Sequence, residues 1–220
     1  MSTITAVLFD FDHTLGVDQH LEFDVLTELA RDACGQTPPR EAVDAALARF
    51  RTGSAPLDAT IVDAFRSWGC PESKLARMPD DFRARALNEA PQRVRPVQGA
   101  PELLRALKKR ATPIGILTNG WTALQHLKAD LIDFPGPTIV SEEIGVWKPD
   151  PKAFLIAASR LDMAPSTTVY VGDEPATDVA GSKAAGMLAA LVALDDKTHA
   201  SKDPQPDFVL TSVLQLLDVL

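Results

Sequence analysis

This chain of 220 residues has few cysteines, no excess of positive charge and no long apolar run. The two cysteines, Cys34 and Cys70, are too few for a disulfide framework and lack zinc or redox spacing, so we expect reduced thiols. The formal net charge of −8 disfavours a general binder of nucleic-acid polymers or anionic membranes, which needs a basic face. No run reaches the roughly 18–20 apolar residues of a membrane span, and the first residues lack the pattern of a signal peptide. We therefore expect a cytoplasmic protein without a membrane partner.

The composition is that of a globular protein with a full core. Apolar residues make up 45% of the chain and charged residues 24%. The length suits one large domain or a domain that carries an insert, and there are no internal repeats. Between Leu15 and Pro91 the apolar residues follow a helical period only. We expect four helices in this part, at 18–34, 40–50, 59–69 and about 78–91.

From Pro96 onward, strand patterns alternate with helix patterns. Such alternation predicts an α/β fold, a three-layer α/β/α sandwich around a doubly wound, Rossmann-like parallel sheet with right-handed crossovers. We expect a core of residues 1–15 and 95–220, interrupted by a helical insert at 16–94. The expected strands are 6–9, 113–117, 138–140, 168–171 and 188–194, and the expected helices are 100–111, 121–131, 151–161, 175–186 and 213–220.

Two acids follow the first expected strand. The apolar run Ala6-Val7-Leu8-Phe9 leads directly into Asp10, and Asp12 comes two residues later. Residues two apart in an extended chain point to the same side, so both carboxylates can face one small volume. Their repulsion and desolvation are unfavourable unless a divalent cation neutralises them. Taken alone, the two acids could also be turn formers.

Polar residues also follow the later expected strands. Thr118 and Asn119 follow the second strand, Lys148 follows the third, and Asp173 and Asp178 follow the fourth. Each has an ordinary explanation as a helix cap, a solvated lysine or an acidic helix start. In an open parallel sheet, however, ligands bind beside the carboxyl ends of the strands. The repetition at successive strand ends therefore favours one shared site.

Four segments, DFDHT, LTNG, GVWKPDP and VGDEPATD, resemble the four motifs of the haloacid dehalogenase (HAD) superfamily, in particular its phosphatase branch. The position of the helical insert, between the first and second motifs, resembles that of a class I cap, which closes over the active site in this superfamily. Two residues depart from the usual pattern. His13 stands where glycine is frequent, and Thr177 stands where asparagine is frequent.

The resemblance implies catalytic roles for individual residues. Asp10 would be the nucleophile that forms an aspartyl-phosphate. Asp12 would protonate the leaving group and then accept a proton from water. Thr118 would bind the phosphoryl oxygens through its hydroxyl and Asn119 through its backbone amide, and Lys148 would offset their negative charge.

The resemblance also implies a Mg²⁺ cofactor. Its ligands would be Asp10, the main-chain carbonyl of Asp12, and Asp173, with Asp178 in support directly or through water. Hard oxygen ligands of this kind suit Mg²⁺.

Together these features predict a phosphomonoester hydrolase that acts on a small phosphorylated metabolite. The acid at Asp12 favours an ester substrate, because a departing halide needs no proton. A phosphomutase of the same superfamily is the first alternative, and a non-catalytic binding protein that retains the fold is the second. The chain is compatible with a monomer or a homodimer.

Overall fold

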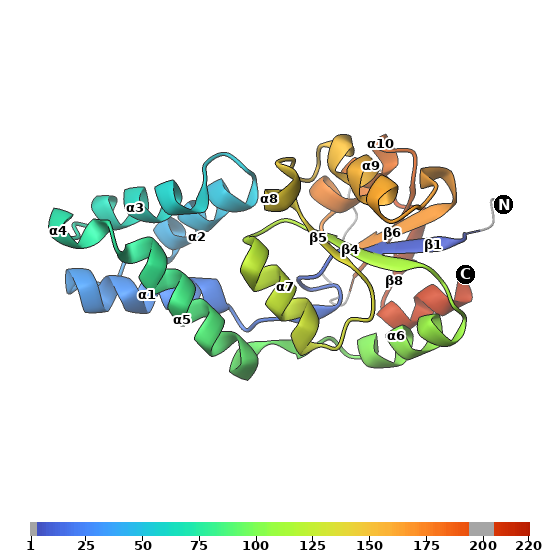
Figure 1. The fold of residues 1–220 in the computed structure, drawn as a ribbon, viewed down its shortest axis with the longest axis horizontal. Coiled ribbons are helices and arrows are strands. Elements are labelled where there is room, and N and C mark those ends of the chain that lie inside the picture. The colour runs from blue at the N-terminus through green and yellow to red at the C-terminus, as the bar shows by residue number, and fades with distance from the viewer. Residues whose placement is uncertain (1–3, 194–204) are drawn as a thin grey trace. The chain divides into compact units, whose positions relative to one another are not determined.

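The computed structural model describes residues 4–193 and 205–220, which divide into two compact units (Figure 1). The core unit contains the chain up to Val17 and from Arg95 onward, and the helical unit is Asp18–Val94. Among the described residues, no helix is both long and apolar enough to cross a membrane.

The described part of the core unit contains a six-stranded parallel sheet in the order β5-β4-β1-β6-β7-β8. The central strand β1 is buried along its whole length, as its apolar sequence predicts. It pairs with β4 on one side and β6 on the other, so the strand order reverses at β1. In open parallel sheets, ligands bind at such a reversal, beside the carboxyl ends of the strands. The strands are β1 (Ala6–Phe9), β4 (Ile114–Thr118), β5 (Thr138–Val140), β6 (Thr168–Gly172), β7 (Leu188–Val192) and β8 (Phe208–Leu210).

Helices cover both faces of this sheet (Figure 1). On one face, Phe154 and Ala157 of α9 pack with Leu8 and Tyr170 of the sheet in a buried cluster. The ring of Phe154 meets that of Tyr170 edge-on, with centroids 4.8 Å apart. The predicted three-layer α/β/α fold is therefore confirmed. The helical segments of this unit are α6 (Ala100–Lys109), α7 (Thr122–Leu131), α8 (Ser141–Ile144), α9 (Pro151–Arg160), a 3-10 turn (Pro165–Thr167), a π-helical turn (Pro175–Val179), α10 (Ala180–Ala184) and a final 3-10 helix (Val213–Asp218).

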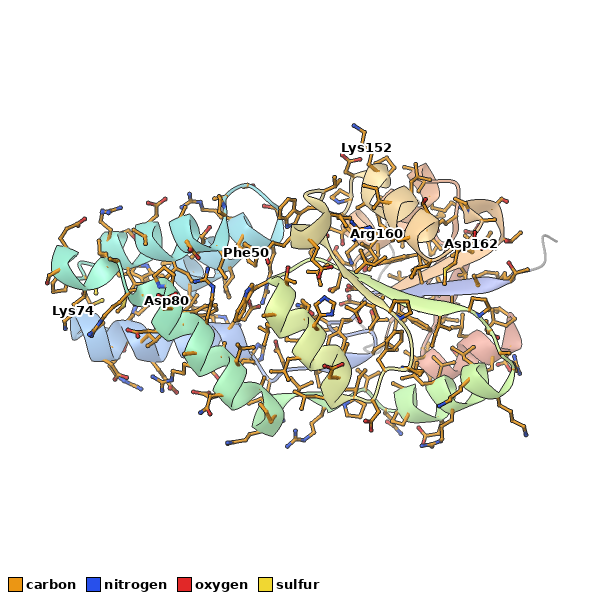
Figure 2. All side chains as sticks on the ribbon, in the orientation of Figure 1. Phe50, Lys74, Asp80, Lys152, Arg160 and Asp162 are labelled. Atoms are coloured by element: carbon orange, nitrogen blue, oxygen red, sulfur yellow. The ribbon has the colours of Figure 1, made fainter. Side chains whose placement is uncertain are left out.

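The helical unit buries one apolar stripe from each of its longer helices. Phe50, Phe65 and Phe82 lie in its interior, each 1% exposed or less, whereas charged side chains such as Lys74 lie toward its surface (Figure 2). Both cysteines belong to this unit and are free thiols. Its helices are α1 (Leu21–Cys34), α2 (Arg40–Arg51), α3 (Leu57–Ser67), α4 (Glu72–Leu75) and α5 (Met78–Arg93).

Short strands and tight helices differ from the sequence-based expectation. The segment expected to be purely helical begins with strand β2 (Gly16–Val17), which pairs antiparallel with β3 (Arg95–Pro96) in the core unit. The expected helix at 175–186 is a π-helical turn followed by α10, and the final expected helix is a 3-10 helix. Helix α5 continues through Pro91 to Arg93, and β8 was not expected. Elements this short contain too few residues for a periodic pattern to be recognised. Residue 194, the last of the fifth expected strand, lies outside the described residues.

Candidate active site

Three carboxylates converge at the carboxyl edge of the sheet. Asp10 follows β1, Asp173 follows β6, and Asp178 lies in the π-helical turn after it. One ligand oxygen from each of these acids lies within 4.8 Å of the others. Asp10 and Asp178 are buried, and Asp173 is partly buried. Among the described residues this cluster is therefore a set of hard oxygen donors that could hold a divalent metal ion.

Lys148 binds directly to this acid cluster. Its Nζ donates hydrogen bonds to Asp10 Oδ1 at 2.8 Å and to Asp178 Oδ1 at 2.8 Å. A third bond runs to Tyr170 Oη at 2.9 Å, and Tyr170 in turn donates to the carbonyl oxygen of Leu117 at 2.7 Å. The lysine side chain is only 3% exposed. A buried ammonium in this position offsets part of the negative charge and fixes Asp10.

The acid cluster carries more negative charge than Lys148 compensates. Burial raises the pKa of Asp10 to about 6, and the charge of Asp178 acts in the same direction while Lys148 opposes both. Burial raises the pKa of Asp173 to about 8, with further contributions from Asp10 and Asp178. Burial alone would lower the pKa of Lys148, but the neighbouring carboxylates raise it well above its ordinary value. Uncompensated buried charge of this kind is typical of functional sites.

Glycine at position 172 makes the close approach of Asp178 to the sheet possible. A Cβ at Gly172 would lie 2.2 Å from Asp178 Oδ2, which is closer than any real contact. Asp178 Oδ2 also accepts a hydrogen bond from the backbone N–H of Glu174 at 3.1 Å. The turn after β6 is thus built to hold this carboxylate.

Asn119 connects the end of β4 to the segment that carries Lys148. Its Oδ1 accepts from the backbone N–H of Lys148 at 3.0 Å, and its Nδ2 donates to the carbonyl of the same residue at 3.0 Å. Ser141 Oγ donates to the same Oδ1. Thr118 is buried at the end of β4, and its hydroxyl donates to the Asn119 carbonyl at 3.3 Å. Asn119 therefore positions Lys148 through its side chain, a contact that was not expected from the sequence.

The carboxylate of Asp12 lies outside the acid cluster and contacts helix α7. Lys128 Nζ donates to Asp12 Oδ1 at 3.0 Å, and Gln125 Nε2 donates to Asp12 Oδ2 at 3.1 Å. The metal contact expected of Asp12 concerns its main-chain carbonyl and stays a prediction. The next residue, His13, has φ of 59°, in the left-handed region that favours glycine. This conformation explains why glycine suits that position.

Lys128 and Tyr170 contact the predicted site residues but were not singled out in the sequence. In the sequence, Tyr170 is one of several residues of a predicted buried strand and carries no separate signal of function. Lys128 lies on the buried face of α7, and a lysine at an apolar position of the helical pattern was the available signal. A lysine within an otherwise buried helical stripe is unusual enough to indicate a specific partner.

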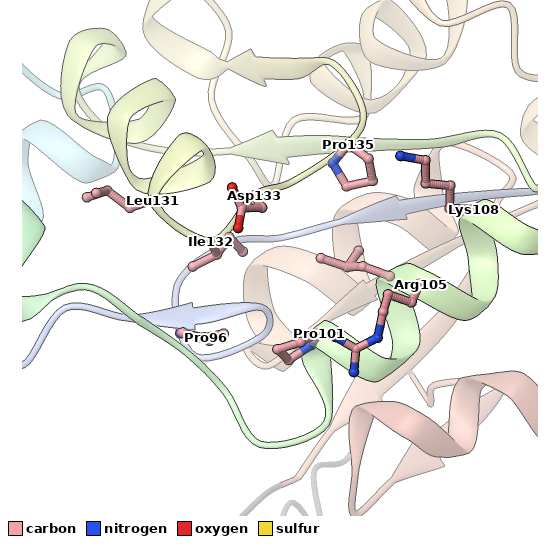
Figure 3. Close-up of a pocket in the computed structure, with 9 residues that line it drawn as sticks. Pro96, Pro101, Arg105, Lys108, Leu131, Ile132, Asp133 and Pro135 are labelled. Atoms are coloured by element: carbon pink, nitrogen blue, oxygen red, sulfur yellow. The ribbon is translucent and has the colours of Figure 1, made fainter.

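A separate pocket of about 340 Å³ lies on the core unit (Figure 3). Arg105 and Lys108 of α6 face Asp133 and Pro135, which follow α7. None of the predicted site residues lines it. It is lined by Pro96, Pro101, Leu104, Arg105, Lys108, Leu131, Ile132, Asp133 and Pro135.

Comparison with known proteins places the chain in a family. A family model described as haloacid dehalogenase-like hydrolase matches residues 4–186. The chain is 34% identical to a glyceraldehyde 3-phosphate phosphatase from Methanopyrus kandleri over 123 residues, 53% of each chain. It is 29% identical to an N-acetylmuramic acid 6-phosphate phosphatase from Pseudomonas aeruginosa over 225 residues, covering 99% of this chain and 95% of that protein. The chain spans about half the length of several other curated relatives that it matches.

A solved structure is similar along nearly the whole chain. The crystal structure of a 2-haloacid dehalogenase from Pseudomonas syringae pv. Tomato superposes with a TM-score of 0.76 at 26% identity, covering 99% of this chain and 98% of that one. The family match, the sheet order and the four motifs all agree. The chain therefore belongs to the haloacid dehalogenase-like hydrolase family.

Proposed function

We propose that this protein is a Mg²⁺-dependent phosphomonoester hydrolase that acts on a small phosphorylated metabolite. The observation that carries the proposal is the hydrogen bond from the buried Lys148 ammonium to Asp10, within a cluster of three carboxylates. A carboxylate held next to a buried cation can approach an anionic phosphoryl group, which an uncompensated acid cluster would repel.

The reaction that we infer proceeds in two steps. In the first step an Asp10 oxygen attacks phosphorus, the bond from phosphorus to the leaving oxygen breaks, and Asp12 protonates that oxygen. In the second step water attacks the phosphorus of the aspartyl-phosphate while Asp12 removes a proton from this water. Inorganic phosphate leaves, and both aspartates return to their initial states.

Three further groups would stabilise the phosphoryl oxygens. Lys148 supplies a positive charge, the Thr118 hydroxyl can turn from the Asn119 carbonyl to donate its hydrogen bond, and the backbone N–H of Asn119 can donate another. Phosphoryl transfer depends mainly on positioning and charge neutralisation, so such fixed donors suit it.

The donor set at the acid cluster fits Mg²⁺. Asp10, Asp173 and the main-chain carbonyl of Asp12 would hold the ion, with Asp178 in support, and these are hard oxygen donors. The raised pKa values of Asp10 and Asp173 support this assignment, because they indicate negative charge that a cation would stabilise. When bound, Mg²⁺ would supply positive charge opposite the phosphoryl oxygens.

The substrate class is inferred from the relatives and from Asp12. Similar proteins bear the names glyceraldehyde 3-phosphate phosphatase and N-acetylmuramic acid 6-phosphate phosphatase. A 2-haloacid dehalogenase is also similar, but a halide leaves without a proton, so an acid at Asp12 favours an ester. We infer that the helical unit Asp18–Val94 is the cap that selects among such esters.

Hydrolysis of p-nitrophenyl phosphate with and without Mg²⁺ tests the proposal. The wild type should release phosphate only with the metal, and Asp10→Asn should abolish release. Asp207→Asn is the matched control, since Asp207 also pairs with a lysine, Lys183, at 2.8 Å, and it should remain active. Acid-quenched wild type should carry a hydroxylamine-labile phosphoryl group on the peptide that contains Asp10.

Other outcomes would replace the proposal. Interconversion of sugar phosphates without phosphate release would identify a phosphomutase. A folded protein that acts on no member of a panel of metabolite phosphates would indicate a binding protein. Halide release from 2-haloacids would assign the dehalogenase reaction instead.

A further inference from the structure

The carboxylate of Asp12 is held on both of its oxygens by one helix. Lys128 Nζ of α7 donates to Oδ1 at 3.0 Å, and Gln125 Nε2 of α7 donates to Oδ2 at 3.1 Å. Lys128 is fully buried and Gln125 is 2% exposed, whereas the Asp12 side chain is 33% exposed. Two donors within the protein thus hold a carboxylate that still reaches solvent.

Both donor side chains lower the stability of the folded state by their burial. Complete burial of a lysine ammonium carries a desolvation penalty that pairing only partly offsets. Gln125 Oε1 is buried and has no hydrogen-bond partner among the residues that the structure describes, although buried amide groups are nearly always satisfied. When Asp12 is ionised, the orientation of the amide with Nε2 toward Asp12 is the favourable one, because a carboxylate accepts hydrogen bonds and would repel the Oε1 atom. A helix that served only packing would have apolar residues at these two positions.

The turn before α7 leaves room for Gln125. Gly120 has φ of 141°, and a Cβ at this position would lie 2.6 Å from Gln125 Nε2. The glycine of the LTNG segment therefore admits the amide to its place beside Asp12.

We infer that Gln125 and Lys128 are positioning residues that fix the carboxyl group of Asp12, which gives its proton to the leaving oxygen and regains one from the attacking water. The inference rests on the proposed phosphatase function. An aspartate side chain has two rotatable bonds, and two donors from one helix remove this freedom. The orientation matters because a displacement of about 1 Å in a reacting group can reduce a rate by about 100-fold.

The test compares two esters in Lys128→Met and Gln125→Leu variants at saturating Mg²⁺. The value of kcat/KM reports the first step, in which an alkyl phosphate needs a proton on its leaving oxygen and p-nitrophenyl phosphate does not. We expect each variant to lose about tenfold or more in kcat/KM on ethyl phosphate, but less than about threefold on p-nitrophenyl phosphate. Lys183→Met, which removes another paired lysine of the core unit, should leave the ratio of the two unchanged.

The same substitutions in an Asp12→Ala background separate positioning from a structural role. If Gln125 and Lys128 act through Asp12, neither substitution changes the ratio further once Asp12 is absent. Equal losses on both esters, or an effect that persists in the Asp12→Ala background, would overturn the inference. If Lys128→Met fails to fold, Gln125→Leu decides alone, because it keeps the side-chain size and removes the unpaired Oε1.

Failure of the inference and failure of the proposed function give different results. A wild type that hydrolyses neither ester with Mg²⁺ contradicts the proposed function itself. A wild type that hydrolyses both, with variants of unchanged ratio, contradicts only the positioning roles.

Discussion

Replacing Lys148 by methionine should lower the free energy of unfolding, because the acid cluster would lose its cation. Methionine keeps an unbranched chain of similar length but has no charge and no donor. Lys148 donates to Asp10 and Asp178, both at 2.8 Å, and is 3% exposed. The substitution therefore leaves two buried carboxylates without their cation.

The magnitude follows from the two short contacts. At 2.8 Å and an effective dielectric constant of about 20, each attraction is roughly 6 kcal/mol. The lost desolvation penalty of the lysine offsets much of this, and breaking a buried pair typically destabilises by about 3–5 kcal/mol. In a chain of 220 residues, such a loss lowers the melting temperature by about 10 °C.

The loss of stability in Lys148→Met should depend on pH, and the titration of Asp10 determines in which direction. Its folded-state pKa of about 6 is already above its ordinary 3.8, so stability falls as pH rises through this interval. Without Lys148 the folded-state pKa rises further, and the deficit of the variant grows as pH rises above about 6. Below pH 5 the protonated acid hardly needs the lysine, so the deficit shrinks.

Thermal melts of metal-free protein at pH 5 and pH 8 measure this difference. Lys183→Met serves as the control, because the Lys183 side chain is 36% exposed and its pair with Asp207 should contribute at most about 1 kcal/mol. An equal deficit at both pH values, or none at either, would refute the electrostatic account of the acid cluster.

Three other outcomes are expected. Gly172→Ala should destabilise the protein by about 1–3 kcal/mol in urea unfolding, because its Cβ would lie 2.2 Å from Asp178 Oδ2; unchanged stability would show that Asp178 can move freely. Mg²⁺ should raise the melting temperature more at pH 8 than at pH 6, because ionised Asp173, with a folded-state pKa of about 8, binds it without releasing a proton; a larger gain at pH 6 would contradict this. Asn119→Ala should lower kcat/KM about tenfold by freeing the backbone of Lys148, and unchanged kinetics would show that the segment is held elsewhere.

The sheet and the strand-end residues could be predicted because both depend on local patterns. A run of buried residues such as Ala6–Phe9 marks a parallel strand, and the carboxyl ends of such strands meet at one edge. The proximity of Asp10 and Asp173 could therefore be predicted from the sequence alone. The family match agrees with the resemblance that the four motifs carry.

The contacts that could not be predicted depend on the rotation of helices and on short elements. Lys128 and Asp12 are 116 residues apart, and helical periodicity places Lys128 on a buried face without saying what that face meets. The strand pair Gly16–Val17 and Arg95–Pro96 has two residues per strand, too few for a periodic pattern. Asn119 was expected to act through its backbone, whereas its side-chain bonds to Lys148 require the three-dimensional path of the chain.

The raised pKa values of Asp10 and Asp173 indicate where Lys148 compensates the negative charge of the acid cluster least. Lys148 donates directly to Asp10 and Asp178, and its charge opposes the effect of burial on Asp10, whose pKa is about 6. Asp173 is less buried than Asp10 and yet has a pKa of about 8, because the charges of Asp10 and Asp178 add to its desolvation. Lys148 thus compensates the acid cluster least at Asp173, which keeps its proton up to about pH 8. A divalent cation that replaces this proton would stabilise the ionised cluster there.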